Sequence, residues 1–195
     1  MDVDRVVLFV HVLAAMILCG AGSVAHVGMA QLLSADGMDV VRRWGRTLHH
    51  VDPFFGPGSV VLFLTGAYLV DQAFRWGTGW IVASVAGLVA IEVLGITVNR
   101  SWGKRLEAVI IDVPDGPVPP PVRAVAASRG AWLATHGTTG TVVGILYLMT
   151  AKPTGTVGSL LTVAGFGLVG ALTALPFLAR RRAQAPTVSA AGSTA

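Results

Sequence analysis

Apolar residues are concentrated in five continuous stretches of the chain, and polar residues fill the intervals between them. The stretches occupy residues 6–33, 54–73, 80–98, 130–150 and 157–178. A transmembrane helix needs about 20 mostly apolar residues, since each residue adds about 1.5 Å along the helix axis. Each stretch is long enough to cross a bilayer. The pattern therefore predicts an all-α fold, a polytopic membrane bundle of five transmembrane helices.

The composition of the chain agrees with this prediction. Hydrophobic residues make up 53% of the sequence, charged residues make up 12%, and the mean hydropathy is +0.70. A water-soluble domain seldom has such values. The intervals between the spans are too short for a second domain, so residues 1–182 are expected to form one transmembrane domain. Because no basic region lies apart from the spans, a nucleic-acid-binding surface is excluded. The expected partner is the lipid bilayer, and a homo-oligomer or a membrane partner subunit stays open.

Lysine and arginine are distributed unevenly between the two sets of connecting segments. Eleven of the 14 lie in residues 34–53, in residues 99–129 and after residue 178, whereas Arg5, Arg75 and Lys152 lie in the other set. Cytoplasmic segments are enriched in basic residues. This asymmetry predicts that the N-terminus lies outside and the C-terminus in the cytoplasm.

Two segments outside the spans have a distinctive composition. Residues 112–121 contain five prolines, which disfavour helix and favour an extended conformation. We expect a stiff cytoplasmic strap between the third and fourth spans, with a docking segment for a proline-binding partner as the alternative. Residues 183–195 are small and polar, which predicts a disordered tail.

Histidine and glutamate residues inside or beside the spans are the candidates for function. A charged side chain at the centre of a span costs about 2.5–3.5 kcal/mol on insertion scales, so it usually persists for a reason. His26, Glu92 and His136 lie at one depth, roughly 10 Å below the cytoplasmic face. His49 and His50 precede the second span on the same side. We therefore predict a cluster of the first three residues, with His49 and His50 at its rim.

This cluster is compatible with several chemistries. Two histidines on facing helices, here His26 and His136, can ligate one iron while each gives its other ring nitrogen to an acceptor. The favoured hypothesis is therefore a b-type haem in a redox or haem-handling role. With Glu92 the pair could equally bind a divalent metal ion or form a proton relay. A small-solute or metal-ion permease and a ligand-free structural or regulatory subunit are the alternatives, and each histidine alone could simply bond across helices.

A third histidine, His11, lies on the first span 15 residues before His26. The separation is about 22 Å along a helix, and it resembles the two-level haem spacing of respiratory cytochrome b subunits. The fourth span has no histidine near its outer end. The sequence also contains no cysteine pair, His-Glu-x-x-His motif, phosphate-binding loop or nucleophile elbow, so hydrolytic and nucleotide-dependent chemistry has no support.

Several short motifs carry a family resemblance. They are LFVHVLAA at residues 8–15, CGAG at 19–22, GPG at 56–58, LTGAYL at 64–69 and WIVAS at 80–84. Together they resemble a family of predicted bacterial integral membrane proteins known as a domain of unknown function. The resemblance covers roughly the first three spans and implies a multi-pass protein of a bacterial-type cytoplasmic membrane.

The first-span histidine also resembles, more distantly, two other membrane families. These are the copper-resistance D-type membrane domain and the J-type protoporphyrinogen oxidase. In the oxidase family a first-span histidine is implicated in haem binding, and His11 is the position here that matches it. The tryptophan and arginine that follow in that family's span are missing from this sequence, which argues against oxidase activity.

Overall fold

The computed structural model describes residues 2–183, and within them the chain is helical and has no β-strand. The predicted all-α class is confirmed. The segment predicted to be a disordered tail lies outside the described residues, apart from Ala183, which ends the last helix.

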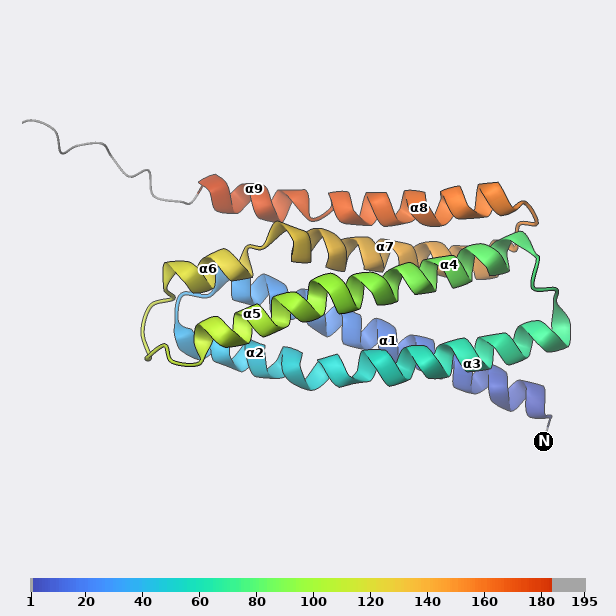
Figure 1. The fold of residues 1–195 in the computed structure, drawn as a ribbon, viewed down its shortest axis with the longest axis horizontal. Coiled ribbons are helices and arrows are strands. Elements are labelled where there is room, and N and C mark those ends of the chain that lie inside the picture. The colour runs from blue at the N-terminus through green and yellow to red at the C-terminus, as the bar shows by residue number, and fades with distance from the viewer. Residues whose placement is uncertain (1, 184–195) are drawn as a thin grey trace, which may run out of the picture.

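The described helices form five long rods and one short helix (Figure 1). The first two rods are α1 (Val3–Ser34) and the continuous series α2 (Met38–Val51), η1 (Asp52–Phe54) and α3 (Phe55–Ala73). The third rod joins α4 (Gly79–Leu94), the π-helical turn η2 (Gly95–Asn99) and α5 (Arg100–Ile110). The short helix α6 (Pro120–Ala126) precedes α7 (Arg129–Ala151), and the last rod joins α8 (Thr156–Leu172) to α9 (Leu175–Ala183).

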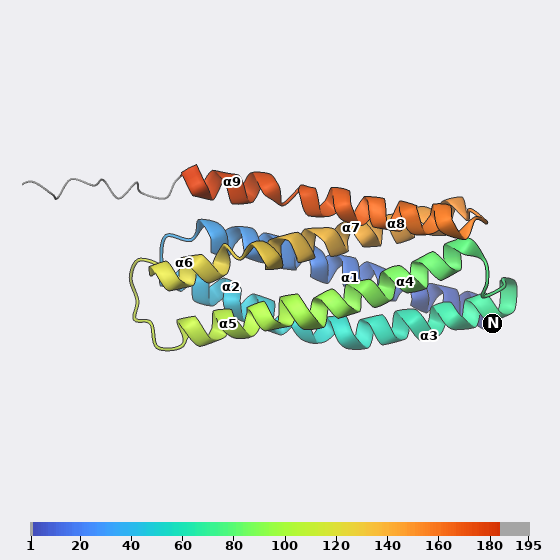
Figure 2. The same ribbon diagram turned by 45° about the horizontal axis from the view of Figure 1, so that its top comes forward.

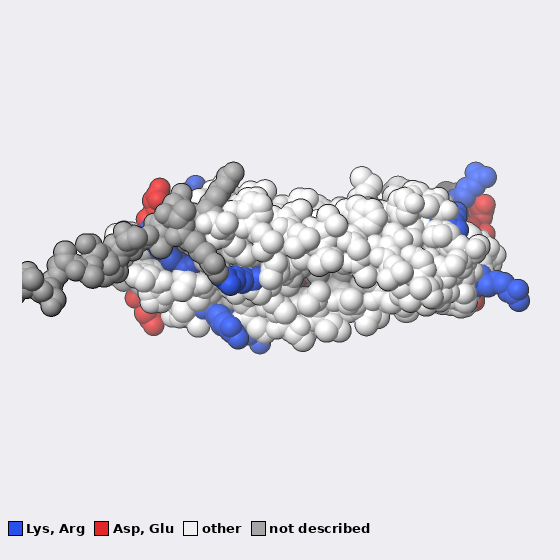
Figure 3. All heavy atoms as spheres, turned by 90° about the horizontal axis from the view of Figure 1, so that it is seen from above, with Lys and Arg blue, Asp and Glu red and all other residues white. Residues whose placement is uncertain are grey.

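Four of the described rods are long and apolar enough to cross a membrane. They are Val3–Ser34, Met38–Ala73, Gly79–Ile110 and Thr156–Ala179. The fifth, α7, has a lower hydropathy because its first half carries His136 and several threonines. Charged side chains gather at the two ends of the bundle, and the face between them is uncharged (Figure 3). A belt of this kind is what a bilayer requires of the protein surface.

The second and third rods extend beyond the predicted spans. Their 36 and 32 residues correspond to roughly 50 Å of helix, whereas the hydrocarbon core of a bilayer is about 30 Å thick. The segments 34–53 and 99–129, predicted to be connections, are therefore largely helical. Their helices are amphipathic, since α2 buries Met38 and Val41 while Arg43 is exposed.

These extensions pack into a small core of their own, which we call the basic-end cap. It is built from the end of α1 with α2, α5 and α6, and its buried residues are Leu32, Ala35, Met38, Val41, Leu106, Val118, Val122 and Ala126. The exposed faces of α2 and α5 carry basic residues, namely Arg43, Arg46, Lys104 and Arg105. A second hydrophobic core, beyond the predicted spans, thus adjoins the transmembrane bundle.

The proline-rich segment was predicted to be an extended strap between the third and fourth spans, and part of it is non-helical and lies on the cap. Residues 111–119 contain no helix, and the Met38 N–H donates to the carbonyl of Gly116 at 2.9 Å. The Arg42 guanidinium pairs with Asp115 and donates to the Val113 carbonyl. The last two prolines instead begin α6, because proline is tolerated in the first turn of a helix, where its missing N–H has no intrahelical partner.

Close glycine contacts hold α7 against α8. A Cβ atom at Gly140 would lie 2.1 Å from the carbonyl oxygen of Phe166, and one at Gly170 would lie 2.5 Å from that of His136. Small residues allow such backbone approach between membrane helices. Helix α4 joins this pair through Gly87, which contacts Ile145 and Val163. Helices α4, α7 and α8 therefore form one three-helix unit.

Helix α1 belongs to a second unit, with α2 and α3 as its main neighbours. Apart from Ala14, its buried residues are confined to its last two turns, from Gly28 to Leu33. The two units meet at the end away from the cap, where Val70 of α3 packs with Trp80 and Leu148, and near the basic end, where α1 contacts α7 (Figures 1 and 2). The second meeting point contains the candidate site.

Candidate functional site

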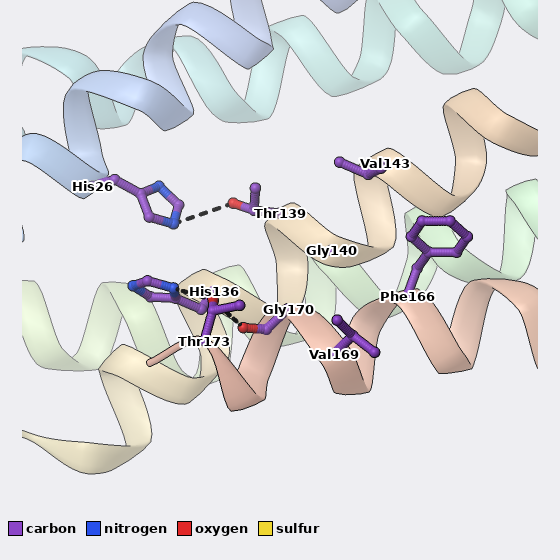
Figure 4. Close-up of a pocket in the computed structure, with 9 residues that line it drawn as sticks. All are labelled: His26, His136, Thr139, Gly140, Val143, Phe166, Val169, Gly170 and Thr173. Carbon is purple, nitrogen blue, oxygen red and sulfur yellow. Dashed lines mark hydrogen bonds between the residues drawn. The ribbon is translucent and has the colours of Figure 1, made fainter. Parts of the chain in front are cut away.

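The structure brings together His26 of α1 and His136 of α7. Their ring centroids are 4.8 Å apart and the rings meet edge to face at 69°. Figure 4 shows the two side chains projecting toward one another from facing helices. Both lie at the level where the α1 unit contacts the three-helix unit.

Hydrogen bonding determines the tautomer of His26. Its Nδ1 lies 2.8 Å from the carbonyl oxygen of Gly22, one turn earlier on α1. A carbonyl oxygen can only accept, so Nδ1 is the donor and, in the neutral ring, Nε2 carries the lone pair. Nε2 is directed toward the hydroxyl of Thr139, at 3.3 Å (Figure 4).

The ring of His136 is held in the same tautomer by α8. The Thr173 hydroxyl donates to the Gly170 carbonyl at 2.6 Å, so its oxygen accepts from His136 Nδ1 at 2.9 Å. Nε2 of His136 is then the unprotonated nitrogen of the neutral ring. Histidines that ligate a metal commonly donate from the other ring nitrogen in this way, which fixes their orientation.

Aromatic rings surround His136 on its basic-end side. Trp132 stacks on the imidazole with a centroid distance of 5.5 Å, and Phe177 of α9 lies 5.7 Å away. The indole N–H of Trp132 donates to the Ala126 carbonyl of α6 at 3.0 Å. The sequence-based interpretation missed both aromatic residues. The four-residue spacing of Trp132 and His136 places them on one helical face, so Trp132 could have been found from the sequence.

A pocket of about 330 Å³ adjoins the two histidines. It is lined from three helices, α1, α7 and α8, by His26, His136, Thr139, Gly140, Val143, Phe166, Val169, Gly170 and Thr173. The imidazoles and threonines lie at one end, and Val143, Phe166 and Val169 form an apolar wall at the other (Figure 4). The pocket is open and not an enclosed cavity.

Glu92 does not join the histidine pair. Within residues 2–183, no three histidine, cysteine, aspartate or glutamate side chains lie close enough to hold one metal ion. Glu92 belongs to α4, which packs mainly on α7 and α8, whereas His26 belongs to α1 in the other unit. The predicted metal site of His26, Glu92 and His136 is therefore not formed, because equal depth along separate helices does not imply proximity across the bundle.

The other predicted histidines lie apart from the pair. His49 and His50 are exposed on α2, and their rings contact each other at 6.0 Å. His11 lies in the opposite half of α1, where its Nδ1 bonds with the hydroxyl of Thr65 at 3.0 Å and its ring packs on Gly66 of α3. His11 thus joins α1 to α3 and does not face the pocket.

Comparison with known proteins identifies the family. The model of a family described as predicted integral membrane protein, DUF2269, matches residues 5–153. The chain belongs to this DUF2269 family. The match includes His26 and His136 and stops before α8 and Thr173, which caps the C-terminus of α8. No curated protein and no solved structure matches the chain. The resemblance to this family is confirmed, and the more distant one to the copper-resistance and oxidase domains is not.

Proposed function

We propose that this DUF2269 protein binds a b-type haem beside His26 and His136 and acts in electron transfer or haem handling. One observation carries the proposal. Two adjacent imidazoles within a membrane bundle line one largely apolar pocket, and each has Nδ1 engaged by an acceptor, which makes Nε2 the unprotonated nitrogen of the neutral ring. Histidines that ligate a metal commonly donate from their other ring nitrogen to such an acceptor.

The spacing of the rings favours ligation by one histidine. Imidazoles on opposite faces of one metal would have their ligating nitrogens about 4 Å apart and their ring centres about 6 Å apart, given bonds of ~2.0–2.1 Å. The observed 4.8 Å edge-to-face contact leaves no slot for a porphyrin between the rings. His26, whose Nε2 is directed toward Thr139 at the pocket, would hold the haem, and His136 would have a positioning role.

The residues of the site supply orientation and water exclusion. The Gly22 carbonyl fixes the orientation of the His26 ring. Val143, Phe166 and Val169 provide an apolar surface for a flat macrocycle. The pocket volume is at the low end of the range for ligand sites, about 300–1,000 Å³, so it would enclose only part of a porphyrin. Haem, when bound, supplies one-electron chemistry.

The arrangement supports binding over permeation, the alternative function. A permease needs a polar path through both halves of the membrane. The hydrogen-bonded groups of the site lie in the basic-end half of α7, whereas the segment from Val142 to Leu148 contains no charged residue and buries Gly144 and Leu148 in the helix contacts. The polar groups of the site therefore end part-way along α7.

An absorbance spectrum tests the proposal. Protein expressed with an adequate haem supply and purified in detergent is expected to show a Soret band. His26→Ala should abolish the band or reduce its intensity at least tenfold, and His136→Ala should shift it and reduce haem retention. His11→Ala and His49→Ala serve as controls and should retain it. A colourless wild-type protein, or haem occupancy unchanged in both site variants, would refute the proposal.

A further inference from the structure

We infer that the pocket beside His26 and His136 is loaded sideways from the bilayer, and that its ligand is a membrane-dissolved molecule. The inference deepens the proposed function, on which it rests for the identity of the ligand as haem. The route itself follows from which walls of the pocket are closed and which are open.

The floor of the pocket, toward the basic end, is closed. The residues that pack there are Met29, Leu33, Ala131, Trp132 and Ala174, and each is at most 7% exposed. Trp132 stacks on His136 from this side and is 1% exposed. Its indole is bonded to α6 of the cap. A solute in the water at the basic end therefore has no opening toward the two histidines.

The back of the pocket, between α7 and α8, is closed as well. At Gly140 even a Cβ atom would overlap the Phe166 carbonyl, and at Gly144 it would lie 3.0 Å from the Cβ of Phe166. Helix α4 covers the far side of this pair through Gly87. No ligand can pass between helices in such contact.

The remaining side faces the membrane. Val143 of α7 is 46% exposed and Val169 of α8 is 61% exposed. Across the opening, α1 diverges from α7 beyond His26, since Val24 and Ile17 are exposed and, apart from Ala14, the buried residues of α1 lie near Met29. These side chains lie in the uncharged belt, where lipid covers them. The opening therefore connects the site with the hydrocarbon.

This geometry selects the class of ligand. A hydrated ion or a hydrophilic solute would have to lose its water in the hydrocarbon before it reached His26, which is costly. A flat, largely apolar molecule that partitions into the bilayer, such as a porphyrin, reaches the Nε2 atom without that cost. The site thus takes ligand from the membrane phase.

Site-directed spin labelling tests the route without haem. In a Cys19→Ser background, Thr139→Cys carries a nitroxide into the pocket, and Val143→Cys carries one to its mouth. Leu161→Cys on the exposed face of α8 and Glu107→Cys on the cap are the lipid and water controls. In vesicles, dissolved oxygen should increase the spin-relaxation rate of the two pocket labels to within about twofold of the lipid control. A water-soluble nickel chelate should increase that rate only slightly. Relaxation by nickel at the level of Glu107→Cys would overturn the inference.

Loading kinetics give the second test. Val169→Trp narrows the mouth of the pocket, whereas Leu168→Trp places the same bulk on a neighbouring exposed position that does not line it. Haem transfer from preloaded vesicles should be at least fivefold slower in Val169→Trp than in Leu168→Trp, and equal rates would count against lateral entry. If wild-type protein binds no haem while the spin labels report lipid, the proposed function fails and the lateral route holds.

Discussion

The ring of His26 lies edge-on against the ring of His136, with 4.8 Å between their centroids, and this contact joins the two helical units of the bundle inside the membrane. A hydrogen bond orients each ring. The Gly22 carbonyl of the same helix accepts from His26, and the Thr173 hydroxyl at the end of α8 accepts from His136. The pair is thus held in place by its surroundings as well as by its own contact.

The contact should contribute to stability. His26→Ala and His136→Ala should each lower the free energy of unfolding by about 1–2 kcal/mol, since each removes an aromatic contact and an interhelical hydrogen bond. The double variant should lose less than the sum, because the two rings touch. Unfolding in mixed detergent micelles measures these values, with the exposed His49→Ala as control. Strict additivity would show that the rings are energetically independent.

Removing the Thr173 hydroxyl should release the tautomer of His136. Thr173→Val keeps the shape of the side chain but leaves Nδ1 of His136 without its acceptor, at a cost of about 0.6–2 kcal/mol in a membrane. The nitrogen chemical shifts of His136 should then report a mixture of tautomers. Thr162→Val, which removes only a bond to the Gly158 carbonyl of its own helix, should leave the His136 spectrum unchanged.

The glycine contacts between α7 and α8 should not tolerate a methyl group. Gly140→Ala places its Cβ against the backbone of Phe166, which cannot move aside as a side chain can. We expect a loss of about 3 kcal/mol or more, at the upper end of the range for overpacked cores. Gly165→Ala on the same pair of helices meets no atom within 4 Å and should be neutral. Thermal unfolding of both variants provides the comparison.

Arg42 should hold the proline-rich segment on the cap. Arg42→Ala removes both the pair with Asp115 and the bond to the Val113 carbonyl, so amide hydrogen exchange in residues 111–119 should rise several-fold. Asp115→Asn should have a smaller effect, because Asp115 is exposed and surface pairs are worth about 0–1 kcal/mol. Arg43→Ala, which loses only the exposed pair with Asp39, is the control. Unchanged exchange in Arg42→Ala would contradict this assignment.

The distribution of basic residues predicts the orientation in the membrane. A reporter fused after Ala195 should read as cytoplasmic. The two lysines of the chain supply an internal control. An impermeant amine reagent applied to intact cells should label Lys152, which is exposed at the end of α7, and should spare Lys104 on the cap. Labelling of Lys104 alone would reverse the predicted orientation.

The sequence by itself determined the helices and their order. Runs of about 20 apolar residues leave the backbone no alternative to helix in a bilayer, because every N–H and C=O must be bonded within the segment. The uneven distribution of arginine and lysine, the depth of His26 and His136 along their helices, and the small residues at Gly140 and Gly144 could all be read from the same pattern. These features depend on position along one helix and on nothing else.

Only the tertiary structure decided which polar residues meet. His26 contacts His136 because α1 touches α7 near the basic end, whereas Glu92, at a similar depth, lies on α4, which does not bring it into a cluster with the two histidines. The extension of α2 and α5 beyond the spans, and the stacking of Trp132 and Phe177 on His136, also depend on packing. The sequence of a helix specifies how far each side chain lies along the axis and on which face. Which helix becomes its neighbour depends on close contacts between distant segments, such as that of Gly140 with Gly170.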